Sequence, residues 1–357
     1  MSDPQASVTK DEKSALAWIE SVDPPPACIE PMLSSNALAV LERRYLKKDP
    51  ETGLVVEDPR QILWRVARSI ARPELSYPDG SPEKALAIAL EFYDLMARRR
   101  FMPNSPTLMN AGREMGMLSA CFVLPVEDSI DGIFDSIKAT ALIQKAGGGT
   151  GFSFSRLRPR GDLVRSSGGT TEGPLSFIQV FSKATDAIQQ GAFRRGANMG
   201  ILRVDHPDIL EFITIKDDLG RLQNYNISVA VTDRFLEQLA DDPTLRHRVE
   251  NPRTKVWADL PRRDENDEET GEYWTVGELW DLIVSHAWQT GEPGVVFIDR
   301  INAKNPIKNV GLIEATNPCG CSPCTPTTRA TWARSTSACS FVRTTASASS
   351  TGRSTAR

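Results

Sequence analysis

Apolar residues recur at helical spacing in three segments near the start of the chain. The segments are Ala37/Val40/Leu41/Leu46, Ile62/Leu63/Val66/Ile70 and Leu86/Leu90/Phe92/Tyr93/Met96. Asp58-Pro59 and Ser81-Pro82 are typical of helix starts, because a capping side chain precedes a proline at the first helical position. The pattern predicts a small helical domain over residues 33–100. Residues 1–32 are polar and contain Pro24-Pro25-Pro26, so we expect a flexible arm there.

From Phe101 onward the pattern alternates between strands and helices. Short apolar runs at 121–126 and 294–299, and the alternation Ile227/Val229/Val231, predict strands. Helical spacing appears within 130–141, 175–188 and 276–284. Strands that alternate with helices favour an α/β architecture with parallel pairing.

The globular pattern stops after Gly320. Residues 321–357 contain no Asp, Glu, Lys, Leu or Ile, and Ser, Thr, Ala and Arg dominate them. Ordering each residue costs ~1–2 kcal/mol of backbone entropy, which so few large aliphatic side chains cannot offset. The sequence therefore predicts a disordered tail over 321–357.

Charge and cysteine usage exclude some classes of protein. The net charge is −4, and the tail carries five Arg and no acid, so residues 1–320 sum to −4 − 5 = −9. An acidic body argues against a nucleic-acid partner, which needs clustered Lys and Arg. No run approaches the ~20 apolar residues of a membrane span. Cys28, Cys121 and Cys319 make no disulfide framework, so we expect a cytoplasmic protein without a membrane partner.

Two of these cysteines stand in different contexts. Cys121 lies in an apolar run and by itself is typical of a buried strand cysteine. Cys319 lies in the turn sequence Asn-Pro-Cys-Gly, where a thiol could be a nucleophile, a redox centre or a metal ligand. A zinc-type knot with Cys321 and Cys324 is an alternative, although it lacks a clear fourth ligand.

Two glycine-containing segments invite interpretation as anion sites. The cluster 147–151 lacks the Gly-Lys-Ser/Thr ending of a phosphate loop, so its glycines either let backbone amides approach an anion or allow close packing. The segment 190–196 places Arg194 beside Arg195, which suits a phosphate or a base edge as well as a solvated loop.

Several motifs follow one another in a single order. They are 102–112 (MPNSPTLMNAG), 118–125 (LSACFVLP), 145–151 (KAGGGTG), 190–196 (QGAFRRG), 292–302 (EPGVVFIDRIN) and 317–320 (NPCG). Together they resemble ribonucleotide reductases, most closely the adenosylcobalamin-dependent class II, from about Asn36 to Gly320. The resemblance implies that residues 101–320 form the first half of a ten-stranded α/β barrel. It also implies reduction of ribonucleotides to deoxyribonucleotides for DNA synthesis by thiyl-radical chemistry, with adenosylcobalamin as cofactor.

The resemblance implies roles for particular residues. Cys319 matches the thiyl radical that abstracts the ribose 3′ hydrogen, Asn317 matches the amide that binds the sugar hydroxyl, and Cys121 matches one half of the redox dithiol. The implied substrate-binding residues are Ser105, Ala120, Cys121, Gly147, Asn317 and Cys319. The implied effector-binding residues are Asp128, Ser129, Ile130 and Arg158. The implied specificity loop contains Gln190, Gly191, Arg194, Arg195 and Gly196. No metal ligands are implied.

The resemblance also implies partners. The substrate would be a ribonucleoside diphosphate or triphosphate, and deoxyribonucleotides would act as effectors. The intact enzyme would take electrons from a thioredoxin-type dithiol and would form a homodimer.

The sequence departs from the family where the tail begins. The family has Glu as general base at the position of Cys321, and losing a positioned base typically costs ~10²–10⁴ in rate. The second redox cysteine, expected about ten residues beyond Cys319 in a Ser-Cys-Asn-Leu-Gly context, is missing. Codons for 322–342 read one nucleotide out of frame can give that context, so we expect a frameshift at 320–321 and an inactive fragment. The alternatives are a catalytically dead nucleotide- or effector-binding module and the metal knot at 319–324.

Overall fold

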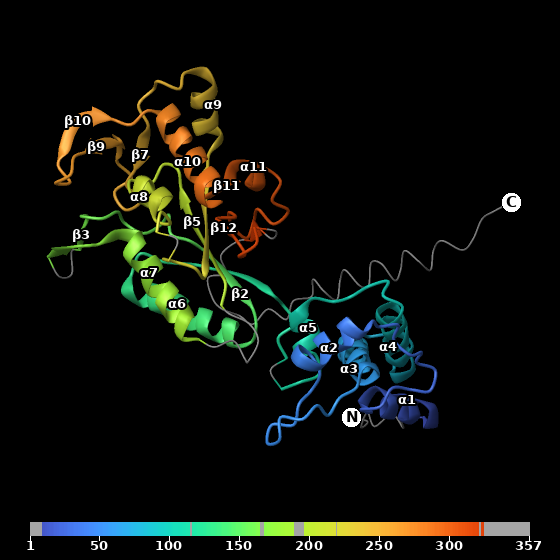
Figure 1. Ribbon diagram of the computed structural model, residues 1–357. Coiled ribbons are helices and arrows are strands. Elements are labelled where there is room, and N and C mark those ends of the chain that lie inside the picture. Colours follow the sequence, from blue (N-terminus) through green and yellow to red (C-terminus); the bar gives the residue numbers. More distant parts are fainter. Residues whose placement is uncertain are drawn as a thin grey trace. The chain divides into compact units, whose positions relative to one another are not determined.

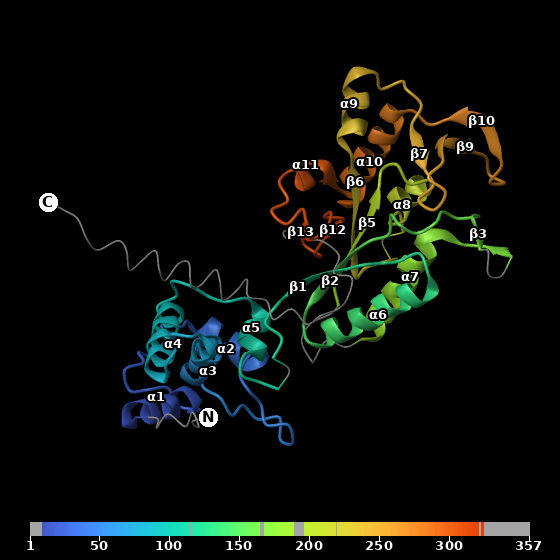
Figure 2. The same cartoon turned by 180° about the vertical axis from the view of Figure 1, so that it is seen from behind.

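The computed structural model describes two compact units. It covers residues 9–114, 116–164, 168–188, 196–218, 220–320 and 323–324 of the chain. The first unit ends at Ala120 and the second begins at Cys121 (Figure 1, Figure 2). The boundary lies later than Arg100, where the sequence placed it, because helix α5, Ser105–Asn110, contributes Leu108 to the helical core.

The first unit is helical, as the periodicity predicts. Its helices are α1 Lys10–Glu20, α2 Ser35–Arg44, α3 Pro59–Ala71, α4 Pro82–Ala97 and α5, with the 3₁₀ turn η1 Arg72–Ser76. Both expected helix starts are confirmed, since the Asp58 side chain accepts from the Gln61 amide and the Ser81 side chain accepts from the Lys84 amide.

Helix α1 corrects the expectation of an arm over residues 1–32. Thr9 and Glu12 form a capping box at its start, so the first backbone amides have partners within the chain. Ile19 is buried in the helical core, and α1 packs against α4. This apolar contact gives residues 10–20 a reason to be helical that their polar composition hides.

A buried ion pair stands inside the first unit. The Arg65 guanidinium on α3 bonds Glu57 through Nε–Oε1 at 2.6 Å and Nη2–Oε2 at 3.0 Å. It also donates to the carbonyls of Leu108 and Ala111, which flank the end of α5. Both side chains of the pair are about 7% exposed or less. The pair therefore fastens α5 to α3 with every bond shielded from water.

A five-stranded parallel sheet is the centre of the second unit. Its order is β1-β2-β5-β6-β11, with bounds Cys121–Leu124, Gly149–Ser153, Asn198–Arg203, Tyr225–Val231 and Gly294–Phe297. The intervening helices are α6 Ile130–Lys145, α7 Gly173–Ala187, α8 Ile209–Thr214, α9 Asp233–Asp241, α10 Val276–Thr290 and α11 Ile298–Ala303. The α/β architecture with parallel pairing is thus confirmed.

Short antiparallel pairs extend from this framework. They are β3 Leu163–Val164 with β4 Gly169–Thr170, β7 Arg248–Glu250 with β8 Trp257–Asp259, β9 Pro261–Arg263 with β10 Glu269–Tyr273, and β12 Ala315–Thr316 with β13 Pro323–Cys324. The pair β12–β13 places two residues of the tail in a strand. The rest of the tail lies outside the described residues, so its disorder stays a prediction.

The two faces of the sheet have different cores. On one face, Phe152, Leu202 and Val229 pack in a large core together with apolar residues of α6, α7, α8 and α10. On the other face, Val123, Met199, Ile201 and Ala230 pack with Ile313 and Ala315. In-and-out alternation along each strand produces this division. The second face is the one that receives the segment leading to Cys319.

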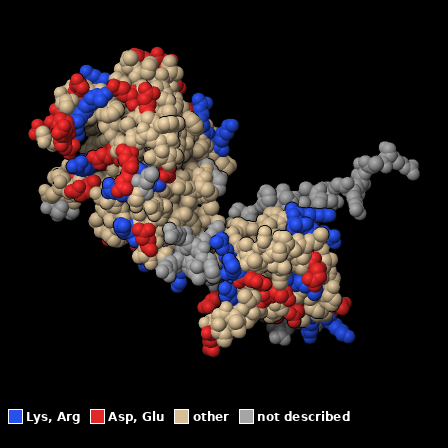
Figure 3. Space-filling view, in the orientation of Figure 1, with Lys and Arg blue, Asp and Glu red and all other residues tan. Residues whose placement is uncertain are grey.

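The surface of the second unit carries both signs of charge. Acidic and basic side chains lie interspersed over its face in Figure 3. No helix in the described ranges is both long enough and apolar enough to cross a bilayer.

Candidate active site

Strand β12 lies directly on strand β2. A Cβ atom added to Gly151 would be 1.7 Å from the carbonyl oxygen of Thr316, and one added to Gly149 would be 2.8 Å from Cγ of Pro318. Real Cβ atoms essentially never approach other atoms so closely, so only glycine fits at Gly151. The glycine cluster left two readings open, and the structure supports close packing at these two positions.

The four residues Asn317–Gly320, which we call the cysteine loop, follow β12. The amide nitrogen Nδ2 of Asn317 donates to Sγ of Cys121 at 3.0 Å and to Sγ of Cys319 at 2.9 Å. The two sulfur atoms are therefore at most 5.9 Å apart, the sum of these lengths. Asn317 is buried, Cys121 is half-buried and Cys319 is exposed. The structure thus joins three residues that are separated by almost two hundred positions in the sequence.

Backbone contacts hold the cysteine loop in place. The Asn226 side chain donates to the carbonyl of Pro318 at 2.6 Å, and the Gly320 amide donates to the carbonyl of Asn317 at 2.9 Å. Gly320 has φ of 69°, a left-handed conformation that glycine adopts without strain. Cys121, Gly149 and Asn226 lie at the amino ends of β1, β2 and β6. The loop therefore sits across the amino edge of the parallel sheet.

A buried polar network lies at the same edge. The Oδ1 atom of Asn198 accepts from Thr150 at 2.7 Å and from Gln144 at 2.9 Å, while its Nδ2 donates to Thr185 at 2.9 Å. Gly196 packs against this network. A Cβ atom added to Gly196 would be 2.3 Å from Cγ2 of Thr185, so this position favours glycine. Gly196 belongs to the implied specificity loop. The other members, Gln190, Gly191, Arg194 and Arg195, lie outside the described residues.

The remaining implied substrate residues divide between the two units. Ser105 opens α5 in the first unit, and its hydroxyl lies 3.0 Å from the Tyr45 hydroxyl. Ala120 ends the first unit and is bonded to Cys121. Gly147 lies two residues before β2 with φ of 89°, and the space where its Cβ would stand is open. Cys121, Gly147, Asn317 and Cys319 therefore belong to one unit.

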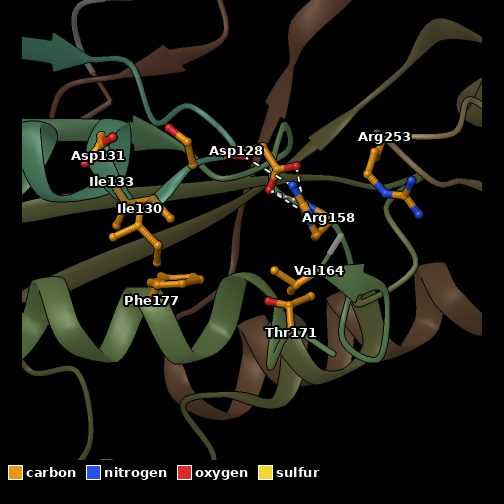
Figure 4. A pocket seen from close by; sticks show the side chains of 10 residues that line it. Asp128, Ile130, Asp131, Ile133, Arg158, Val164, Thr171, Phe177 and Arg253 are labelled. Carbon is orange, nitrogen blue, oxygen red and sulfur yellow. Dashed lines mark hydrogen bonds and ion pairs between the residues drawn. The ribbon is translucent and has the colours of Figure 1, made fainter. Parts of the chain in front are cut away.

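The implied effector residues line one cavity, which we call the Asp128 pocket. Its volume is about 650 Å³. Figure 4 shows Asp128 and Arg158 facing each other, with Ile130 close to Phe177 and Arg253 apart from them. The lining residues are Asp128, Ser129, Ile130, Asp131, Ile133, Arg158, Val164, Thr171, Phe177 and Arg253. All four implied residues, Asp128, Ser129, Ile130 and Arg158, are among them.

Ion pairs fix the charged groups of the Asp128 pocket. Arg158 Nε bonds both oxygens of Asp128, at 3.1 and 2.9 Å. Arg253 Nε bonds Asp162 Oδ2 at 2.8 Å, and this contact lowers the pKa of Asp162 to about 2. The Ser129 hydroxyl accepts from the Gly132 amide and caps α6. The pocket thus combines two guanidinium groups with an apolar side formed by Ile130 and Phe177.

Sequence reasoning missed several residues of these sites. Asn226 lies at the edge of an alternating strand, and Arg253, Phe177 and Thr171 come from segments far from Asp128 in the chain. None of them belongs to a recognisable motif, so only the fold brings them in.

The structure leaves the metal-knot alternative at 319–324 without a test. The described part of the chain holds no group of three or more His, Cys, Asp or Glu side chains that could bind a metal ion. Cys321 and the side chain of Cys324 lie outside that part.

Comparison with known proteins identifies the family. Residues 119–341 match the family model described as the barrel domain of ribonucleotide reductase. Residues 32–116 match the model described as its all-alpha domain. The chain belongs to the ribonucleotide reductase family. The helical first unit and the parallel sheet of the second are accordingly its all-alpha domain and part of its barrel domain.

Individual relatives narrow the class. Two "Vitamin B12-dependent ribonucleoside-diphosphate reductases", from Thermoplasma acidophilum and Mycobacterium tuberculosis strain H37Rv, are each 44% identical over 82% of this chain. The "Ribonucleoside-diphosphate reductase large subunit" of Dictyostelium discoideum is 31% identical over 78% of it. The matched part covers 43%, 39% and 32% of these relatives, so this ribonucleotide reductase chain spans less than half their length. The chain is a homologue of the B12-dependent enzymes.

Proposed function

We propose that this chain carries the radical cysteine and the effector site of an adenosylcobalamin-dependent ribonucleotide reductase. The observation that carries the proposal is the Asn317 amide, which bonds both Cys121 and Cys319. The two sulfur atoms serve different steps of the reduction and must face one sugar. A single buried amide between them fixes that arrangement before substrate binds.

Each residue has a distinct part in the proposed reaction. The Cys319 sulfur, as a thiyl radical, takes the 3′ hydrogen atom of the ribose and becomes a thiol, and after the 2′ position has been reduced it returns that hydrogen atom to the 3′ carbon and is again a thiyl radical. Cys121 and a second thiol supply two electrons and two protons while the 2′ hydroxyl leaves as water, and the two thiols become a disulfide. The Asn317 Nδ2 group has two N–H donors, one for each sulfur, and Oδ1 is the atom of this side chain that would accept from a sugar hydroxyl.

The cofactor requirement fits the exposed thiol. When bound, adenosylcobalamin would supply the radical chemistry that makes the Cys319 sulfur a thiyl radical. Cys319 is exposed in the described structure, while Asn317, which donates to its Sγ, is buried. This chain's own contribution is to hold the Cys319 sulfur in place. The Asn317 amide donates to that sulfur, and the Asn226 side chain donates to the carbonyl of Pro318 in the same loop.

The Asp128 pocket suits a deoxyribonucleoside triphosphate effector. The guanidinium groups of Arg158 and Arg253 favour a phosphate chain, and Ile130 and Phe177 offer an apolar surface to a base. The proposed enzyme would take a ribonucleoside diphosphate or triphosphate as substrate. The proposed enzyme would take its electrons from a thioredoxin-type dithiol and would form a homodimer.

The test compares this chain with a version whose reading frame is restored after Gly320. Both are incubated with adenosylcobalamin, a ribonucleoside diphosphate or triphosphate, and a dithiol, and deoxyribonucleotide is quantified by chromatography. We expect product only from the restored chain, because this one has Cys321 where the general base belongs. Cys319→Ser in the restored chain should abolish product. A restored chain that folds and binds nucleotide but forms no product contradicts the proposal.

A catalytically dead effector-binding module is the second candidate. The observation that favours it is that the described residues lining the Asp128 pocket all precede the tail. We expect this chain alone to bind dATP or dTTP in calorimetry without turnover. Arg158→Gln should weaken that binding, and sequencing the gene across 320–321 decides whether the short product is genuine.

A further inference from the structure

Two neighbouring carboxylates face two nearly neighbouring arginines at the carboxyl end of the sheet. Arg158 pairs with Asp128 inside the Asp128 pocket. Arg156, two residues earlier, bonds Glu127 through Nη1–Oε1 at 2.8 Å. The pocket and the second ion pair therefore share the same two short segments of chain. Any movement of 127–128 relative to 156–158 changes both pairs together.

Arg156 also reaches the stem of the cysteine loop. Its Nε bonds Glu314 Oε2 at 2.9 Å, and its Nη2 bonds Glu314 Oε1 at 2.6 Å. This fork-to-fork geometry orients both side chains more strictly than a single contact does. The hydrogen bond to Glu314 is also the main reason that the pKa of Arg156 is raised. The Arg156 guanidinium thus joins Glu127, in the segment after β1, to Glu314, the residue directly before β12.

The path from Glu314 to the cysteine loop is short and rigid. Ala315 and Thr316 of β12 follow directly, and both are buried. The Thr316 carbonyl lies against Gly151 with no room for a side chain. Asn317, which bonds both sulfur atoms, comes next. A shift of Glu314 along the chain direction therefore cannot be absorbed by loose packing before it reaches Asn317.

We propose that Arg156 is a positioning residue that couples the Asp128 pocket to the cysteine loop through Glu314. The inference rests on the proposed effector function of that pocket and goes beyond it. A nucleotide whose phosphates compete for Arg158 displaces Asp128 and its neighbour Glu127. Arg156 follows Glu127, and Glu314 follows Arg156. The reactivity of Cys319 then depends on whether the pocket is occupied.

The first arm of the test needs no nucleotide. The full chain is alkylated with iodoacetamide, and the rates at Cys319 and Cys28 are resolved by mass spectrometry. Arg156→Gln and Glu314→Gln should each change the Cys319 rate by about threefold, the scale expected for a partly exposed ion pair. The double variant should match Arg156→Gln, because the Arg156–Glu314 contact is already lost in that single variant. Cys28, which is buried in the first unit, should keep its rate.

The matched control is Arg262→Gln. It breaks an ion pair with Glu278 of the same length as the Arg156–Glu314 contact, 2.6 Å, and of similar exposure, elsewhere in the second unit. The control should leave the Cys319 rate at the native value. If both Arg156→Gln and Glu314→Gln also leave it there, Arg156 does not position the cysteine loop and the proposal is overturned.

The second arm adds saturating dATP or dTTP, with binding measured separately by calorimetry. Bound nucleotide should change the Cys319 rate in the native chain and leave it unchanged in Arg156→Gln, which still binds. An equal change in both chains overturns the coupling. Absence of binding to the native chain overturns the effector role of the Asp128 pocket and the coupling with it. The proposed chemistry at Cys319 is judged independently by product formation in the restored chain.

Discussion

Replacing Gly151 by alanine tests whether the position of the cysteine loop depends on the absence of a side chain at Gly151. The added Cβ would lie 1.7 Å from the Thr316 carbonyl oxygen and 2.8 Å from its carbonyl carbon. Ordinary contact begins at 3.4 Å, so β12 must retreat by roughly 1.7 Å. Both partners are backbone in buried strands, and no flexible side chain can yield instead.

The cost can be worked from the contacts that this retreat strains. Overpacking of a well-packed interior costs about 1–3 kcal/mol. The two hydrogen bonds from Asn317 to the sulfur atoms, at 3.0 and 2.9 Å, lengthen when β12 moves. Each such bond contributes about 0.5–1.5 kcal/mol. We therefore expect a loss on the order of 2–6 kcal/mol in the free energy of unfolding of the second unit.

Disulfide trapping measures the displacement more directly than stability does. The sulfur atoms of Cys121 and Cys319 are at most 5.9 Å apart, so a mild oxidant should join them in the native chain. The rate is followed by mass spectrometry of the linked peptides. In Gly151→Ala we expect the disulfide to form at least ten times more slowly, because the displacement of β12 moves the cysteine loop away from Cys121.

Gly200→Ala is the control for Gly151→Ala. Gly200 lies on the neighbouring strand β5, where an added Cβ would meet the Tyr225 ring at 3.3 Å and Phe154 at 3.6 Å. Rings can shift by the few tenths of an ångström needed, so trapping should stay close to the native rate. If Gly151→Ala traps as fast as Gly200→Ala and unfolds at the same urea concentration, the close approach of β12 is not what positions the cysteine loop.

Two further predictions concern stability. Burial raises the pKa of Asp208 to about 7 from 3.8, so between these pH values the folded chain holds a proton that the unfolded chain has released. The stability contributed by this proton is fully present below pH 3.8 and is lost as pH rises through 7. Asp208→Asn should therefore melt higher than the native chain at pH 8, and its free energy of unfolding relative to the native chain should rise by on the order of 2 kcal/mol between pH 5 and pH 8. A melting difference that does not vary with pH would contradict this assignment. Arg65→Met should destabilise the first unit by about 3–5 kcal/mol because it leaves Glu57 buried without its main partner, whereas Arg98→Met, which breaks an exposed pair with Asp94, should cost less than about 1 kcal/mol. Equal urea midpoints for these two variants would refute the argument.

Local patterns in the sequence determine much of the fold. Capping residues followed by proline locate the starts of α3 and α4 because the interaction is complete within one helical turn. Alternation of strands and helices in 121–299 gives parallel pairing. The strands β2 and β5 were missed, since Gly149–Ser153 is rich in glycine and Asn198–Arg203 is buried on both faces and does not alternate. Helix α1 was missed because its stability comes from packing on α4.

The candidate site divides in the same way. Ordered motifs in the sequence were enough to single out Cys121, Asn317 and Cys319, and the four implied effector residues that the structure then gathers in one cavity. The sequence also marked Gly320 as the place where the globular pattern stops.

Only the tertiary structure decided how these residues act on one another. It placed the Asn317 amide between two sulfur atoms and packed the β12 backbone directly against Gly151. It also brought Arg156 between Glu127 and Glu314. The reason is physical. Caps and periodicity are settled among residues a few positions apart, whereas these contacts join segments up to almost two hundred positions apart, and chain folding alone brings such segments within bonding distance.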